Sequence, residues 1–100
     1  MNLLLVTFAL RNSLQDYDSF FVTLRGNSQQ WLHYLDNTFL LYTPYSPDEL
    51  INRLIPHFEA TDSVIIVHVT QPFSGWLPPE AWKWIYERTS LVANQKLLPQ

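Results

Sequence analysis

The sequence predicts a single α+β domain in which two helices cover one face of a four-stranded antiparallel sheet. Apolar residues recur at alternating strand-like and helix-like spacings, and turn or capping residues separate the segments. The segment order is strand, helix, strand, strand, helix, strand, and then a short C-terminal helix. This order predicts a ferredoxin-like βαββαβ fold. We assign residues 1–89 to this domain and residues 90–100 to a C-terminal tail.

The first half of the chain supplies a strand, a helix and a hairpin. Residues 2–8 form an apolar run typical of a strand. We expect Ser13 or Asp16 to cap the following helix, and Gly26-Asn27 to end it through a left-handed residue. Residues 29–35 and 38–43 are typical of strands, and the turn residues between them predict a hairpin.

The second half begins at the clearest boundary in the chain. Ser46, Pro47 and Glu49 form the pattern of a capping box with proline at the first helical position. We expect Pro56 to kink this helix or convert its last turn. Residues 62–69 are predicted as a β-branched strand, and residues 78–80 open the short third helix. The tail is expected to be loosely held or to add a strand to a partner.

The composition points to a protein that hides apolar surface against a partner. Hydrophobic residues make up 47% of the chain and charged residues 15%, against about 25% charged in typical soluble domains. There is no cysteine, so disulfides and thiolate metal sites are excluded. No apolar run approaches the roughly 20 residues of a membrane span. Because the N-terminal apolar run lacks the flanks of a signal peptide, we expect a cytoplasmic protein with no membrane partner.

The first and fourth predicted strands are apolar on both faces, although the two main helices can cover only one face. A second copy of the chain is the simplest cover for the other face, and the third helix is an alternative cover for part of it. We therefore predict a homodimer. The residues assigned to its interface are Leu4, Val6, Phe8, Ile66 and Trp84.

Over about residues 2–89 the chain resembles the small SinR-like proteins related to the CRISPR-associated Cas-two family. The matching pieces are residues 14–17 (LQDY), 31–38 (WLHYLDNT), 46–50 (SPDEL), 62–63 (DS) and 75–77 (GWL). The resemblance implies a ferredoxin-like homodimer, often with C-terminal segments that contact the other subunit. Members of the wider family that the chain resembles are metal-dependent nucleases that carry an acidic residue at the end of the first strand. Ala9 stands at that position here, and a methyl group cannot bind magnesium.

We predict no catalytic residues, no metal site and no cofactor. His33 and His68 lie on predicted strands and would need a third ligand such as Asp36 to hold a metal, so hydrogen-bonded histidines are favoured. His57 near a helix C-terminus suits the helix dipole. Ser/His/Asp combinations built from Ser19, Ser63 or Ser74 lack a supporting turn motif. Two glycines in the whole chain exclude a glycine-rich phosphate loop.

Nucleic-acid binding is a weaker expectation, because the six basic residues are scattered and the net charge is −3. Arg11, Arg25 and Arg53 are the residues assigned to phosphate contacts if the dimer binds nucleic acid. Four hairpin aromatics (Trp31, Tyr34, Phe39 and Tyr42) would form a base-stacking platform only with flanking cations. Residues 27–47 contain neither Lys nor Arg, so core packing or dimer contact is favoured for these aromatics.

The function predicted from the sequence is that of a non-catalytic or catalytically degenerate homodimeric binding protein. By resemblance, its setting is prokaryotic defence or a toxin–antitoxin-like pair, with a protein or a nucleic acid as partner. The main alternative is a metal-dependent endonuclease acting on RNA or DNA through Asp16, Asp18 or Asp36. A ligand-sensing domain with a pocket at the dimer interface is a third interpretation.

Overall fold

The computed structural model describes residues 1–89, and the predicted tail at residues 90–100 lies outside the described residues. Four strands form one antiparallel sheet in the order β2-β3-β1-β4. They are β1 (Asn2–Ala9), β2 (Gln30–Leu35), β3 (Thr38–Thr43) and β4 (Ser63–His68). The α-helices are α1 (Asp18–Gly26), α2 (Pro47–Leu54) and α3 (Pro79–Arg88), and a 3-10 turn, η1 (Ile55–His57), follows α2. The predicted α+β class is confirmed, and this open sheet is compatible with a small ferredoxin-like fold.

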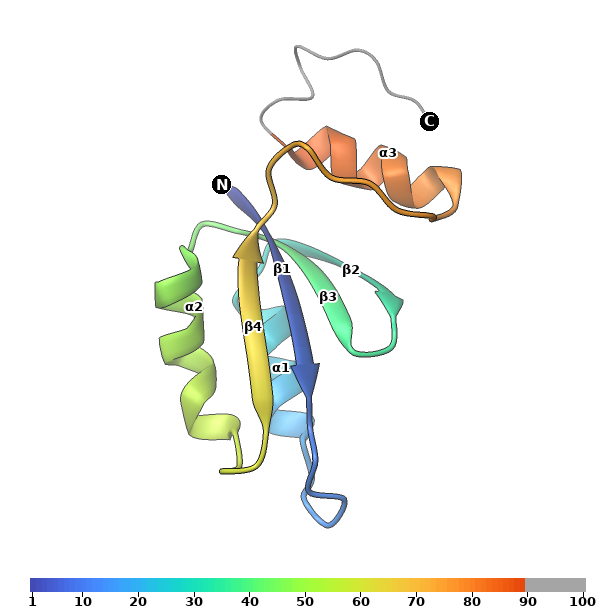
Figure 1. The fold of residues 1–100 in the computed structure, drawn as a ribbon. Coiled ribbons are helices and arrows are strands. Elements are labelled where there is room, and N and C mark those ends of the chain that lie inside the picture. The colour runs from blue at the N-terminus through green and yellow to red at the C-terminus, as the bar shows by residue number, and fades with distance from the viewer. Residues whose placement is uncertain (90–100) are drawn as a thin grey trace.

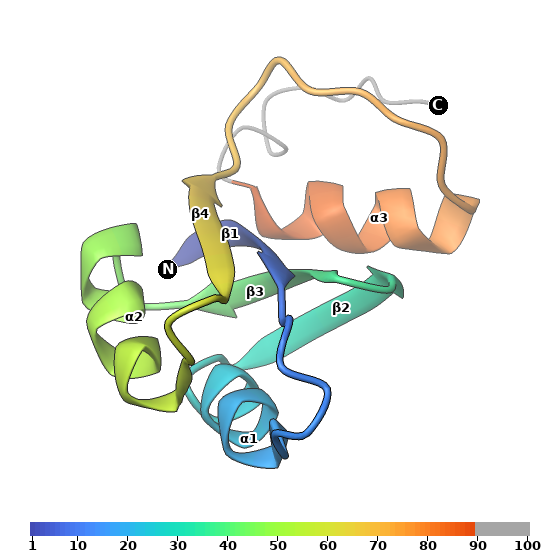
Figure 2. The ribbon, with the colours of Figure 1, turned by 60° about the horizontal axis from the view of Figure 1, so that its bottom comes forward.

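The helices lie on both faces of the sheet. Helices α1 and α2 cover one face, and α3 lies over the other (Figure 2). Figure 1 shows α3 at the end of the sheet where β1 begins and β4 ends. The other end of this second face therefore has no helix over it among residues 1–89, and we call the second face the open face.

The core lies between the sheet and helices α1 and α2. Leu4, Val6 and Phe8 from β1 pack there against a set of helix and β3 side chains, namely Phe20, Leu24, Phe39, Leu41, Leu50 and Leu54. Leu4 and Val6 have no exposed surface at all. Three of the five residues assigned to a dimer interface are thus core residues, and Ile66 packs against the same core. That assignment is wrong for these four, because α1 and α2 cover the even-numbered side of β1 and β4 within one chain.

Helix α2 begins and ends as its sequence predicts. The Ser46 hydroxyl accepts a hydrogen bond from the Glu49 amide at 3.1 Å, and the Glu49 carboxylate accepts one from the Ser46 amide at 2.8 Å. This is the complete capping box. Pro56 lies in η1, so the prediction that it converts the last turn is confirmed.

Helix α1 is bounded differently from the prediction. Its N-cap position is Tyr17, and the Asp16 carboxylate instead accepts a hydrogen bond from the Asp18 amide at 2.9 Å. None of the described residues has a positive φ, so Gly26 is not a left-handed stop. The side chains of Asn27 and Ser28 donate to the carbonyls of Thr23 and Arg25 and close the helix. Side-chain capping replaces the glycine conformation that the prediction assumed.

Helix α3 is fastened to the sheet by its last arginine. The Arg88 Nε donates to the Gln30 side chain on β2 at 2.7 Å. Its guanidinium also lies 4.3 Å from the centre of the Trp84 ring and 6.0 Å from that of Tyr42 on β3. Cation–π contacts of this kind and the hydrogen bond hold the C-terminal end of α3 on the open face. Trp84, assigned to a dimer interface, is half-buried, and one face of its ring contacts the Arg88 guanidinium.

Candidate functional site

The open face carries apolar side chains that no described helix covers. The pairings Leu5↔Leu40 and Leu5↔Val67 place odd-numbered β1 residues and their partners on this face. Ile65 is 58% exposed and Val67 is 47% exposed, although both lie within a strand. Large exposed apolar patches on soluble proteins commonly mark interaction sites. The strands that are apolar on both faces therefore have their uncovered side here. It carries the odd-numbered residues of β1 and β4, whereas the predicted interface used the even-numbered ones.

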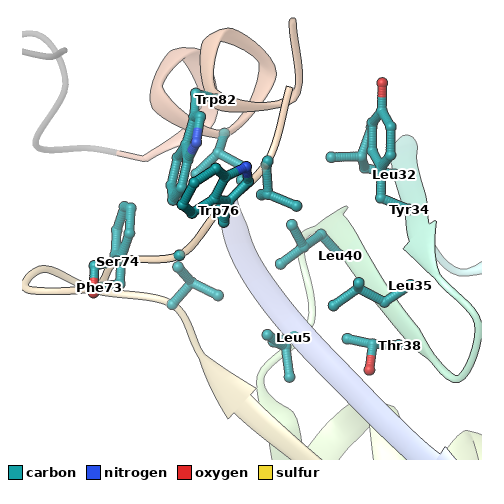
Figure 3. Close-up of a pocket in the computed structure, with 14 residues that line it drawn as sticks. Leu5, Leu32, Tyr34, Leu35, Thr38, Leu40, Phe73, Ser74, Trp76 and Trp82 are labelled. Carbon is teal, nitrogen blue, oxygen red and sulfur yellow. The ribbon is translucent and has the colours of Figure 1, made fainter. Parts of the chain in front are cut away.

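A pocket of about 250 Å³ opens between α3, the preceding loop and the open face. Its floor is made by leucines of three strands, which are Leu5, Leu32 and Leu40. Across from them stand the aromatic side chains of the loop and of α3 (Figure 3). Among residues 1–89, the side chains that line this pocket carry no charge. A largely apolar recess of this kind accepts apolar or aromatic groups and rejects ions.

Two aromatic residues of the pocket wall, Phe73 and Trp82, stack with each other and with Tyr86 outside the pocket. The rings of Phe73, Trp82 and Tyr86 stack in pairs at centroid distances of 5.8 to 6.3 Å. A side chain at Gly75 would meet the Trp82 ring at 3.7 Å, so the loop runs close over α3 at this point. The next residue, Trp76, is 98% exposed. The loop is thus held against α3, and Trp76 lines the mouth of the pocket in its own chain although its side chain is almost fully exposed.

Tyr34 and Glu80 join the hairpin to α3 at the rim of the pocket. The Tyr34 hydroxyl donates to the Glu80 carboxylate at 3.2 Å. Partial desolvation and this hydrogen bond to a carboxylate raise the pKa of Tyr34 above its usual value. The phenol therefore stays protonated at neutral pH, and it keeps a lone pair that accepts a hydrogen bond from a bound group.

Ala9 stands at the end of β1, where the resemblance stated from the sequence would imply a metal-binding acid. The structure pairs Ala9 with Ser63 and places the Asp62 carboxylate beside the residues that follow β1. Its Oδ1 accepts hydrogen bonds from the Arg11 amide at 2.8 Å and the Tyr17 hydroxyl at 2.7 Å. Its Oδ2 accepts one from the Glu59 amide at 2.8 Å. This carboxylate ties three chain segments together, and reasoning from the sequence missed it because its partners are 45 and 51 positions away.

The electrostatics of Asp62 follow from these contacts. Partial desolvation acts to raise the pKa of Asp62, but the amides of Arg11 and Glu59, the Tyr17 hydroxyl and the Arg11 charge outweigh it. The pKa of Asp62 therefore lies below its usual value of 3.8. Desolvation and the hydrogen bond to Asp62 raise the pKa of Tyr17. Asp62 is thus ionised at neutral pH with both oxygens engaged.

We expect Asp62→Asn to destabilise the protein in a pH-dependent way. A carboxylate whose pKa is lower in the folded state stabilises that state above its unfolded pKa, and the contribution is lost as the pH falls through the folded pKa. Wild type should therefore exceed Asp62→Asn in unfolding free energy at neutral pH, and the difference should shrink below pH 3.8. Urea unfolding at a series of pH values measures this difference. Asp36→Asn, in the exposed hairpin turn, is the control, and an equal loss in both variants would contradict the assignment.

The structure does not bring the three arginines assigned to phosphate contacts together. Arg11 follows β1 at the end of the sheet where β4 begins. The Arg53 guanidinium lies 4.1 Å from the Tyr45 ring centre and donates to Asn27, which is bonded to Thr43 at the other end. The two ends are separated by the eight residues of β1, or roughly 23 Å. Arg25 lies in the last turn of α1. One chain therefore offers no single patch made of these three.

The histidines have hydrogen-bonding roles. His33 contacts the Asp36 carbonyl at 3.0 Å and stacks on Phe39. His57 lies between the hydroxyls of Ser19 and Thr23, at 3.0 and 3.1 Å. Ser19 and His57, two members of a hypothetical Ser/His/Asp triad, are within hydrogen-bonding distance. The other ring nitrogen of His57 is next to the Thr23 hydroxyl. Within residues 1–89 there is no group of three His, Asp or Glu side chains placed to hold a metal ion.

The hairpin aromatics are divided between different surroundings. Phe39 is in the core, while Trp31 and Tyr34 are about half exposed. Cations from distant positions reach this region, since Arg88 lies over Tyr42 and Arg53 over Tyr45. A search for nearby Lys or Arg in the sequence could not find them, because both come from helices that fold back onto the sheet.

Comparisons of the chain with family models, curated proteins and solved structures gave no match. No helix in residues 1–89 has the length and apolar character that a membrane crossing requires.

Proposed function

We propose that the protein is a homodimeric, catalytically degenerate binding protein of ferredoxin-like fold, of the SinR-like and Cas-two type. The observation that carries the proposal is the apolar surface of the open face, with Ile65 and Val67 of β4 exposed. A strand that presents branched apolar side chains to water is a liability for a monomer. A second copy removes that surface from water in both chains at once.

The strand order supports the ferredoxin-like part of the proposal. Read from the other edge, the sheet order is β4-β1-β3-β2, with all neighbours antiparallel. Each main helix connects two strands that are not neighbours in the sheet, and both helices lie on the same face. Two interleaved βαβ units produce this arrangement.

The chemistry at the end of β1 supports the degenerate part. Ala9 offers no ligand, and both oxygens of the nearby Asp62 carboxylate accept hydrogen bonds from the protein itself. A divalent metal would have to displace three such bonds to use that carboxylate. The exposed Asp16 and Asp18 lie at the start of α1, where the helix dipole favours negative charge.

The proposed setting is the cytoplasm of a prokaryote, in defence against mobile elements or in a toxin–antitoxin-like pair. Binding, to a protein or a nucleic acid, would then be the activity of the dimer. If the partner is a nucleic acid, its phosphates would meet arginines on the outer, helical side, such as Arg25 and Arg53, because the open faces are turned toward each other.

Incubation with labelled RNA and DNA, with and without Mg²⁺ or Mn²⁺, tests the proposal against the endonuclease alternative. We expect no cleavage by wild type and none by Asp16→Ala or Asp36→Ala. Metal-dependent cleavage by wild type that either variant loses would overturn the degenerate assignment. A gel-shift titration over a range of salt concentrations, with Arg53→Ala as the binding variant, tests nucleic acid as the partner.

A further inference from the structure

We propose that Trp76 of each copy inserts into the pocket between α3 and the open face of the other copy, and so anchors the dimer. This inference rests on the proposed homodimer and names the residue that fixes its geometry. Trp76 is 98% exposed, whereas tryptophan is among the residues with most to gain from burial, at about 150 to 250 Å² for each aromatic side chain.

The position of Trp76 is maintained by its neighbours. A Cβ at Gly75 would lie 3.7 Å from the Trp82 ring, and Phe73 stacks on the same indole. Proline follows at positions 78 and 79 and limits the backbone on the other side. The loop therefore presents Trp76 at the pocket mouth (Figure 3) at a low cost in conformational entropy.

The pocket fits an indole in size and chemistry. With Trp76 of the same chain at its mouth, the pocket has a volume of about 250 Å³, which is room for a side chain rather than for one or two water molecules. Leu5, Leu32 and Leu40 supply an apolar floor. At the rim, the Tyr34 hydroxyl donates to Glu80 and keeps an acceptor lone pair for an indole N–H.

A second copy is the occupant that the surface itself specifies. The projecting tryptophan and the pocket lie on one face, so a twofold axis repeats both and satisfies them together. The chain has a net charge of −3, yet the described pocket lining carries none, so the nearest charge is the Glu80 carboxylate at the rim, which accepts the Tyr34 hydrogen bond. Trp76 exposes nearly all of the roughly 150 to 250 Å² of an aromatic side chain, and Tyr34, Leu35, Ile65 and Val67 add further exposed apolar surface. A stable interface buries about 800 Å² per partner, so Trp76 alone supplies about a quarter of one.

Two variants test the reciprocal contact. Trp76→Ala removes the side chain, and Leu40→Trp fills the pocket from its floor. Each should raise the dimer dissociation constant by roughly 30-fold or more, as for an interface hot spot. Trp31→Ala is the matched control, because Trp31 is also exposed but pairs with the core residue Leu41 on the opposite face. Sedimentation equilibrium measures the constants, and circular dichroism checks that each variant is folded.

Mixing the two variants gives the sharper result. Neither homodimer keeps an insertion, but the heterodimer keeps one, from Trp76 of the Leu40→Trp copy into the open pocket of the Trp76→Ala copy. Native mass spectrometry should therefore show heterodimer in excess over both homodimers. A statistical distribution, or a Trp76→Ala dimer as tight as wild type, would overturn the inference while leaving the homodimer itself intact.

Other outcomes are distinguishable. A monomeric wild type would overturn the proposed homodimer and this inference with it. A variant ending at Thr89 that dimerises more tightly than the full chain would identify residues 90–100 as the occupant of the pocket, and would overturn the inference.

Discussion

Phe20→Ala is expected to lower the free energy of unfolding by about 3 to 5 kcal/mol. Phe20 is fully buried at the centre of the core between the sheet and the helices. Its ring contacts those of Phe8, Phe21 and Phe58 at centroid distances of 5.2, 5.0 and 5.3 Å. Removing it deletes three aromatic contacts and leaves a cavity among rings that cannot easily close it.

Urea unfolding at one fixed protein concentration measures this loss, because dimerisation makes apparent stability depend on concentration. Val22→Ala on the same helix is the control. Val22 is 61% exposed, and its truncation should change stability by only about 0.5 kcal/mol. A Phe20→Ala loss as small as that of Val22→Ala would contradict the assignment of the core.

Val67→Asp is expected to dissociate the dimer without unfolding the chain. In the monomer the new carboxylate reaches water, since Val67 is 47% exposed. In a dimer formed through the open face it would be buried without a partner, which is costly for a charge. The dissociation constant should rise by a factor on the order of 100.

The control for this prediction uses the opposite face. Val22→Asp places the same charge on α1, on the far side of the sheet, and should leave the dissociation constant unchanged. Sedimentation equilibrium on both variants makes the comparison. Equal effects at the two positions, or no effect at either, would show that the dimer does not use the open face.

Much of the fold could be predicted because local signals agree with tertiary structure. Ser46 and Glu49 form the capping box that their spacing predicts, and the residues of β1 and β4 lie where their apolar runs indicate. The order of elements then limits the topology to few choices.

The face of the sheet that meets the helices could not be read from the sequence. Leu4 and Leu5 are both apolar, so the period-two pattern that normally orients a strand is absent. The structure resolves this, because Leu4 is in the core while Leu5 lines the pocket. The predicted interface residues Leu4, Val6 and Phe8 therefore lie on the face that α1 and α2 cover.

Contacts between distant segments were the other part that sequence reasoning missed. The Asp62 carboxylate is satisfied by Arg11 and Tyr17, and Arg88 reaches Tyr42 across the sheet. Neither pairing has a local sequence signal. The end of α1 is a third case, since Asn27 and Ser28 close it through their side chains, and either a glycine or a side chain can serve that purpose.

The central claim is that two copies associate through the open face, and the molar mass in solution tests it most directly. Light scattering at tens of micromolar, a range suited to interfaces of this size, should give twice the 11.8 kDa of one chain. The same measurement on Val67→Asp should give the mass of one chain. A wild type with the mass of one chain across this range would contradict the account.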